Sequence, residues 1–69
     1  MKRDAVSSQN VASVGYDQQT QTLEVEFHNG SVYQYFDVPQ HVYQQLVGGV
    51  SVGKYLNEEI KGNYRYARL

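Results

Sequence analysis

The side chains best suited to metal binding or acid–base catalysis in this sequence are two histidines and two neighbouring glutamates. His28 and His41 are the only imidazoles, and no carboxylate stands at a spacing that would supply a third zinc ligand. Glu24 and Glu26 have the spacing of one strand face, but an open sheet face gives little of the desolvation that separates the pKa values of an acid/base pair. We therefore expect no catalytic residues, no bound metal and no cofactor.

A partial phosphate-loop pattern is formed by Gly48 and the pair Gly53-Lys54. In that motif glycine N–H groups surround the phosphates, and a Ser or Thr after the Lys holds magnesium. Tyr55 occupies the Ser/Thr position, and the preceding residues favour a helix rather than a strand of a parallel sheet. We therefore interpret the glycines as part of a turn between two helices. The sequence also lacks a nucleophile elbow, so we expect that the protein is not an enzyme.

Tyr33 and Tyr35 are the residues that most resemble a binding device, because they project from the same side of one predicted strand. Paired strand aromatics stack unpaired bases at about 1–3 kcal/mol each in small sheet-based modules. The expected strand pairing puts Glu24 and Glu26 on the same face, and carboxylates repel phosphates. The alternative is that helices cover this face and bury both rings as a second small core.

Basic side chains are concentrated at the C-terminal end, although the formal net charge of the chain is -1. Cations interleaved with tyrosines are compatible with phosphate contacts and base stacking. Because the cations are few and the chain is slightly acidic, the charge pattern is weak evidence for RNA binding and weaker evidence for DNA binding. The candidate nucleic-acid or partner-binding residues are Tyr33, Tyr35, Lys54, Lys61, Tyr64, Arg65 and Arg68.

The composition describes one small domain. The chain has 69 residues, seven Tyr and no Cys. A domain of this size buries only roughly 60% of the surface that the unfolded chain exposes, so tyrosines are expected to help fill a thin core. The absence of cysteine excludes a disulfide framework and fits a cytoplasmic protein, and the apolar runs are too short for a secretory signal or a membrane span. We expect a loose N-terminal tail over residues 1–10 and a single domain over residues 11–69.

Alternating apolar residues predict three strands over residues 11–16, 22–28 and 31–36. The strands are joined by short turns, which predicts an antiparallel meander. The first hairpin is expected to pair Tyr16 with Leu23, Val14 with Val25 and Ala12 with Phe27.

Asn29-Gly30 predicts that the second hairpin has a two-residue type I′ turn. That turn would pair Phe27 with Val32 and would put Val32 on the buried face. Tyr33 and Tyr35 would then lie on the opposite face, beside the two strand carboxylates.

Helices are predicted in the second half of the chain. Pro39 suits a first helical turn, and Gly48 marks the end of that helix. Ser51 is the expected N-cap of a second helix that continues to about Lys61. Residues 63–69 alternate again and predict an edge strand. The expected fold class is therefore α+β, with a three-stranded antiparallel meander, two short helices and a C-terminal edge strand.

The order of several short blocks resembles one known family. The chain is similar to the KTSC domain, which is named for the C-terminal domain of some lysyl-tRNA synthetases and also occurs as small stand-alone bacterial proteins. The central Tyr-x-Tyr of that family corresponds to Tyr33 and Tyr35. The resemblance implies a small domain of unassigned function, for which RNA binding is suggested by its attachment to a synthetase. The matching blocks are residues 13–17, 22–27, 29–30, 33–36, 38–39, 53–55, 57, 60–62 and 64–68.

Two functions follow as hypotheses. The first is a non-enzymatic binding domain that contacts RNA or tRNA through the C-terminal cations and the paired tyrosines. The second is a protein interaction module with a Tyr-rich docking face or an exposed strand edge, which would bind an unidentified protein partner. Ionic strength separates the two, because phosphate binding weakens steeply as salt is added and a Tyr-centred protein interface does not.

Overall fold

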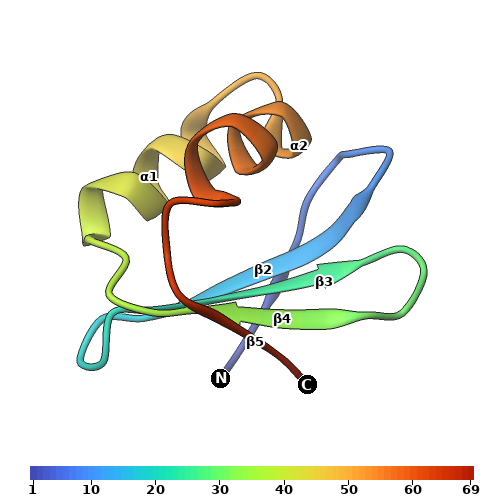
Figure 1. Ribbon diagram of the computed structural model, residues 1–69. Coiled ribbons are helices and arrows are strands. Elements are labelled where there is room, and N and C mark those ends of the chain that lie inside the picture. The colour runs from blue at the N-terminus through green and yellow to red at the C-terminus, as the bar shows by residue number, and fades with distance from the viewer.

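Five antiparallel strands form one sheet in the computed structural model, which describes residues 1–69, and their order in space follows their order in the chain (Figure 1). The strands are β1 (Asp4–Ala5), β2 (Val11–Asp17), β3 (Thr22–Phe27), β4 (Val32–Tyr35) and β5 (Tyr66–Arg68). Between β4 and β5 the chain forms α1 (Gln40–Gly48), α2 (Val52–Tyr55) and a π-helical turn, η1 (Leu56–Ile60). All three helical segments cover the same face of the sheet (Figure 1). The expected α+β meander with two helices and an edge strand is confirmed in outline.

The core lies between the helices and the covered sheet face. Strands β2 and β3 provide its floor, and the apolar sides of the helical segments close it. This is the two-layer arrangement in which a helix stripe and a sheet face remove each other's apolar surface from water. The buried residues of the core are Val11, Val14, Leu23, Val25, Tyr35, Val38, Val42, Leu46, Val52, Leu56 and Ile60.

The hairpin between β3 and β4 differs from the expected two-residue turn. The Phe27 N–H donates to the carbonyl oxygen of Ser31 at 2.9 Å, and the Gly30 N–H donates to that of Phe27 at 2.9 Å. The loop therefore has three residues, with Gly30 at a φ of 90°, as in a type I turn followed by a bulge. The Ser31 N–H, which a two-residue turn would use between the strands, donates instead to Oδ1 of Asn29 at 3.0 Å.

The predicted register of this hairpin is therefore wrong by one residue. Tyr33 pairs with Val25 and Tyr35 pairs with Leu23. A shift of one residue moves every side chain of a strand to the other face of the sheet. Tyr33 and Tyr35 consequently lie on the helix-covered face, and Val32 lies on the open face.

The hairpin between β2 and β3 matches the prediction at two of three pairs. Tyr16 pairs with Leu23 and Val14 with Val25, as expected. The expected pairing of Ala12 with Phe27 is wrong, because the register shifts between Val11 and Ser13, so that Val11 pairs with Phe27. A β-bulge adds one residue to one strand, so the side chains before the bulge point to the opposite face from the one that regular alternation predicts. The bulge turns Val11 into the core, where it is fully buried.

The first ten residues contain strand β1 at the free edge of β2. Asp4 pairs with Val14, and Ala5 pairs with Ser13. This segment approaches β2 closely, because a Cβ on Gly15 would overlap the Lys2 carbonyl oxygen. The segment predicted to be a loose tail therefore includes a short strand that packs along the sheet edge.

The ends of the helices follow the predicted signals. Helix α1 begins directly after Pro39, and its last residue is Gly48. Ser51 caps α2, because its Oγ accepts a hydrogen bond from the Lys54 N–H at 3.2 Å. The second helix ends as a π-helical turn, in which the Lys61 N–H donates to the Leu56 carbonyl oxygen at 2.9 Å. Gly48 is the last residue of α1 and Gly53 the second residue of α2, so the interpretation that these glycines form the turn is wrong in detail. A helix and not a strand precedes Gly53-Lys54, as expected.

Candidate functional site

An open groove lies beside the helices, over the β4 and β5 side of the sheet. Its volume is about 510 Å³. Its lining residues come from the β3–β4 hairpin, from β4 and β5, and from the two residues that follow η1. The residues that line it are Phe27, Asn29, Ser31, Tyr33, Tyr35, Lys61, Gly62 and Tyr66.

Four aromatic rings form a continuous cluster in this groove. The ring centroid of Tyr33 lies 5.7 Å from that of Phe27, 6.4 Å from that of Tyr35 and 5.9 Å from that of Tyr66. Such separations are typical of interacting aromatic pairs. Tyr35 is only 3% exposed and belongs to the core, Tyr33 is half-buried, and Tyr66 is 62% exposed. The cluster therefore runs from a fixed base in the core to a ring that is open to solvent.

Two cations border the aromatic cluster. The Lys61 Nζ lies 5.1 Å from the ring centroid of Phe27, and the Arg68 guanidinium carbon lies 5.8 Å from that of Tyr33. Both separations are within the range of cation–π attraction. No acidic residue lines the groove, so these positive charges meet no carboxylate there.

A second hollow of about 330 Å³ adjoins the groove and shares Phe27 and Lys61 with it. It lies along α2 and η1, where Lys54 and Asn57 contribute to its wall, and it too has no acidic lining residue. The structure thus brings Lys54 and Lys61 to one continuous surface with the aromatic cluster. Five of the candidate binding residues lie on or beside this surface: Tyr33, Tyr35, Lys54, Lys61 and Arg68.

Two other candidate residues lie elsewhere. The Arg65 guanidinium forms an ion pair of 3.0 Å with Asp37 and lies 5.4 Å from the ring centroid of Phe36. Tyr64 packs against the hydrophobic core and, with Arg65, lines another hollow, which shares Gly62 and Tyr66 with the groove. The structure therefore does not gather the C-terminal cations into one patch, because Arg65 is already paired with a carboxylate outside the groove.

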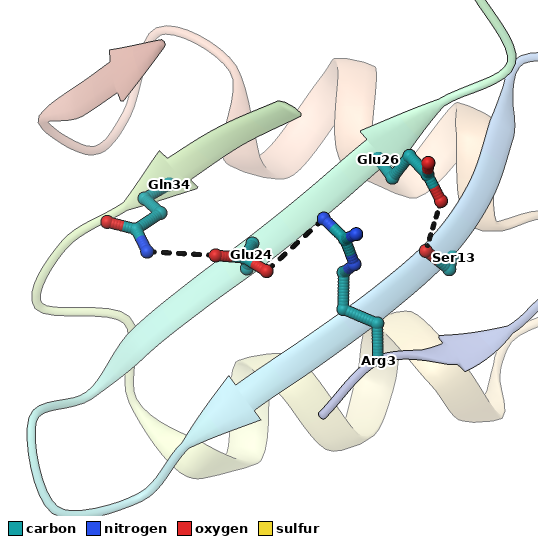
Figure 2. A network of polar contacts seen from close by, with 5 residues as sticks. All are labelled: Arg3, Ser13, Glu24, Glu26 and Gln34. Carbon is teal, nitrogen blue, oxygen red and sulfur yellow. Dashed lines mark hydrogen bonds and ion pairs between the residues drawn. The ribbon is translucent and has the colours of Figure 1, made fainter. Parts of the chain in front are cut away.

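The two strand carboxylates lie on the opposite side of the sheet. Figure 2 shows that face, with the helices behind the strands. Arg3 forms an ion pair of 3.3 Å with Glu24, which also accepts a hydrogen bond of 2.9 Å from Nε2 of Gln34 (Figure 2). The Ser13 hydroxyl donates to Glu26 at 2.9 Å. The expectation that these carboxylates share a face with Tyr33 and Tyr35 is wrong, because the hairpin register is shifted.

The most deeply buried tyrosine of the groove, Tyr35, has a raised pKa. Burial raises the pKa of Tyr35 above its ordinary value of 10.0, and the neighbouring Tyr33 and Tyr66 raise it further. The Tyr35 phenol is therefore neutral at physiological pH and adds no negative charge to the groove. The alternative that the rings are buried applies to Tyr35, which joins the main core rather than a second one.

Besides Gly62, four groove residues were not predicted as site residues: Phe27, Asn29, Ser31 and Tyr66. Phe27 was predicted to pair with Val32 on the buried face, and Tyr66 falls in the predicted edge strand over residues 63–69. Asn29 was predicted in the hairpin turn, and Ser31 at the start of the returning strand. The Asn29 side chain gave the one available signal, because Asn hydrogen-bonds readily to the backbone two residues onward and so favours the longer turn.

The histidines do not form a site together. The Nε2 atom of His28 lies 2.9 Å from the Ser8 carbonyl oxygen, near the β2 bulge. His41 lies in the first turn of α1 and borders a shallow hollow lined by glutamines and glycines.

Comparison with known proteins assigns the family. The KTSC domain family matches residues 7–64. The chain belongs to the KTSC domain family. The crystal structure of a KTSC domain protein from Yersinia pestis is similar to this domain with a TM-score of 0.93 and 35% identity, over 99% of this chain and 96% of that one. The resemblance drawn from the sequence blocks is therefore confirmed.

Relatives of this KTSC domain occur both alone and within longer proteins. An uncharacterized protein of Stutzerimonas stutzeri is 44% identical over 100% of this chain and 99% of its own length. A lysine–tRNA ligase of Nostoc punctiforme is 42% identical over 86% of this chain, and one of Trichormus variabilis is 46% identical over 78%. The match spans 10% of each ligase. The KTSC domain has no assigned function and is not a known catalytic domain.

Helices α1, α2 and η1 are too short and too polar for any of them to cross a lipid bilayer.

Proposed function

We propose that this domain is a non-enzymatic module that binds single-stranded RNA in the groove of Phe27, Tyr33 and Tyr66. The observation that carries the proposal is the separation of charge across the sheet. The aromatic rings and the cations Lys61 and Arg68 line or border the groove, whereas the strand carboxylates lie on the opposite face.

The aromatic rings supply stacking surfaces. Tyr66 is 62% exposed, and Tyr33 lies half-buried beside it with a centroid distance of 5.9 Å. Unpaired bases stack on such rings with little regard to sequence, because every base has a π-face. An alanine substitution at one stacking ring costs about 1–3 kcal/mol of binding free energy.

The cations supply phosphate contacts. Lys61 stands between the groove and the adjoining hollow, and Lys54 lines that hollow. A backbone that passes over the rings would meet Arg68 at one side and Lys61 and Lys54 at the other. So few phosphate contacts give weak binding with a shallow dependence on salt, since each contact to a single strand contributes a slope of about -0.7 to log K against log[salt].

The relatives favour RNA over DNA. The ligases of Nostoc punctiforme and Trichormus variabilis are named for charging tRNA with lysine, and a segment similar to this chain occurs within them. A domain joined to such enzymes meets tRNA, which has single-stranded loops and ends. This support is an analogy between relatives, and the groove geometry is the independent argument.

NMR titration tests the proposal. The labelled domain is titrated with short single-stranded RNA and with bulk tRNA, at low and at physiological salt. We expect backbone shifts at Phe27, Tyr33, Lys61 and Tyr66 that become smaller as salt is added. Tyr66→Ala should weaken binding about fivefold or more, which corresponds to the low end of the stacking range, and should leave the fold intact because the ring is exposed.

Arg65→Ala is the matched control for Lys61→Ala. Both variants remove one positive charge, but Arg65 is paired with Asp37 outside the groove. We expect Lys61→Ala to lower RNA affinity and the steepness of the salt dependence, and Arg65→Ala to change both much less. Equal effects of the two variants would mean that RNA responds only to the net charge of the domain, and they would contradict binding in the groove. Absence of RNA shifts at low salt would favour the second hypothesis, a protein partner at the Tyr-rich face.

A further inference from the structure

The hollow that adjoins the groove along α2 and η1 continues the same surface. Its lining residues come from the start of β2, the end of β3 and the helical segments. Phe27 and Lys61 line both spaces, so the two adjoin at these side chains. Stacking in the groove needs only the rings there. The second hollow therefore decides how much of a ligand beyond the stacked bases the domain holds.

The charged residues that line the second hollow are both lysines, Lys54 and Lys61. Neither forms an ion pair within the domain. The nearby carboxylates Glu58 and Glu59 line neither the hollow nor the groove, so the charges adjacent to both spaces are positive. A lysine ammonium sits on a flexible stem and has three donors, so it can follow a phosphate without one fixed rotamer.

The second hollow suits a sugar–phosphate backbone better than a further base. Phe27 is its only aromatic lining residue. The Lys61 Nζ already lies over that ring, 5.1 Å from its centroid. A base needs a free ring face for stacking, whereas a backbone needs cations and hydrogen-bond donors. The groove and the hollow thus divide stacking and phosphate binding between them.

The two lysines are spaced for different phosphates of one strand. Lys54 lies in α2 and Lys61 directly after η1, seven residues further along the chain. At about 1.5 Å per residue this separation is about 10 Å. A stacked strand advances about 3.4 Å per nucleotide, so that length covers about three nucleotides, and fewer when the strand is stretched. A dinucleotide whose phosphate meets Lys61 therefore does not reach Lys54.

We infer that the second hollow is a subsite for the backbone next to the stacked bases, with Lys54 as its phosphate contact. This inference rests on the proposed RNA-binding function. Bases stack on Tyr33 and Tyr66, and the adjoining backbone passes Lys61 and reaches Lys54. The ligand is then an unpaired stretch of at least about four nucleotides, by the spacing of nucleotides along a strand.

Lys54→Gln tests the subsite with oligouridylates of two, three, four and six nucleotides. The capping bond to Ser51 uses the backbone N–H of Lys54, and glutamine is a good helix former, so the fold is retained. The dinucleotide should bind the variant and the wild type equally. The hexamer should bind the variant at least about 2.6-fold more weakly at about 50 mM salt, which is what one single-strand phosphate contact gains when salt falls fourfold from about 200 mM.

Two control variants and one NMR signal locate the effect. Lys2→Gln removes the same charge from the N-terminal segment, on the sheet face opposite the helices, and it should change hexamer affinity much less. Tyr66→Ala removes stacking in the groove, so it should weaken the dinucleotide and the hexamer by the same factor. Asn57 lines the second hollow, and its side-chain N–H signals should shift with the hexamer but not with the dinucleotide.

Three outcomes decide the inference. A loss of hexamer affinity in Lys54→Gln that is absent for the dinucleotide, together with the hexamer shifts at Asn57, supports the subsite. Unchanged hexamer affinity in Lys54→Gln, an equal loss in Lys2→Gln or an equal loss at every length would overturn it. The RNA-binding function would still stand if Tyr66→Ala weakened the hexamer. Failure of the folded wild-type domain to bind the hexamer would overturn both.

Discussion

Gly15→Ala tests how the N-terminal segment is held on the sheet. Gly15 lies on β2, on the face opposite the helices, and its partner in β3 is Glu24. An alanine Cβ there would overlap the Lys2 carbonyl oxygen and lie 3.0 Å from Cγ of Arg3. Gly15 does not have a positive φ, so the obstacle is steric. The segment must therefore move away, and the ion pair between Arg3 and Glu24 must lengthen or break.

The expected loss of stability follows from the burial of that ion pair. The Arg3 side chain is 29% exposed and that of Glu24 is 11% exposed. Exposed pairs contribute about 0–1 kcal/mol, and breaking fully buried ones costs about 3–5 kcal/mol. Glu24 keeps its hydrogen bond from Gln34, so we place the cost of Gly15→Ala at roughly 1.5 kcal/mol, between these ranges. In a domain of this size that corresponds to a fall in Tm of about 6–12 °C.

Thermal and urea unfolding, followed by circular dichroism, measure this change. Gly48→Ala is the matched control, because no atom lies within 4 Å of its added Cβ and the residue ends α1 without a positive φ. That variant should be neutral or more stable by about 0.4–1 kcal/mol. Arg3→Met combined with Gly15→Ala should cost less than the sum of the two single changes, since both remove the same ion pair. A Gly15→Ala domain with the Tm of the wild type would refute the reasoning.

Three further predictions concern the loop, the core and a helix cap. Gly30→Ala places a side chain at a φ of 90°, so it should lower the free energy of unfolding by about 1–2 kcal/mol in urea titrations. Burial raises the pKa of Tyr35, so the unfolded chain loses this proton at a lower pH than the folded domain does. The resulting contribution to the free energy of unfolding should be complete below about pH 10 and should be lost as the pH rises through the raised pKa. Urea midpoints measured at pH 8 and at pH 11 should therefore differ less in Tyr35→Phe than in the wild type. Ser51→Ala removes the acceptor for the Lys54 N–H, and it should cost roughly 1 kcal/mol by the same assay.

The elements of this fold were predictable because their signals are local. Alternation of apolar residues marks β2 and β3, and Pro39 and Ser51 mark the starts of the two helices. Each of these signals acts through contacts between residues that are close in sequence. The family blocks added the order of the elements along the chain.

The details that define the site were not predictable in the same way. Asn29-Gly30 fits both a two-residue and a three-residue loop, and the hydrogen bond from Ser31 to the Asn29 side chain decides between them. The bulge near Ala12 adds one residue to a strand whose alternation looks regular. Strand β1 has two residues, too few for a period, and Arg3 is fixed by a partner distant in sequence. The hairpin register and the contacts of the edge strand could therefore be determined only from the structure.

The register of one hairpin decides the electrostatics of the whole domain. With a two-residue turn, Tyr33 would share a face with Glu24 and Glu26, and phosphate would be repelled there. The three-residue loop puts Tyr33 on the other face, where Lys61 and Arg68 border the rings. On the opposite face, the ion pair of Arg3 with Glu24 offsets one of the two strand carboxylates, which makes the N-terminal segment part of the electrostatic balance across the sheet.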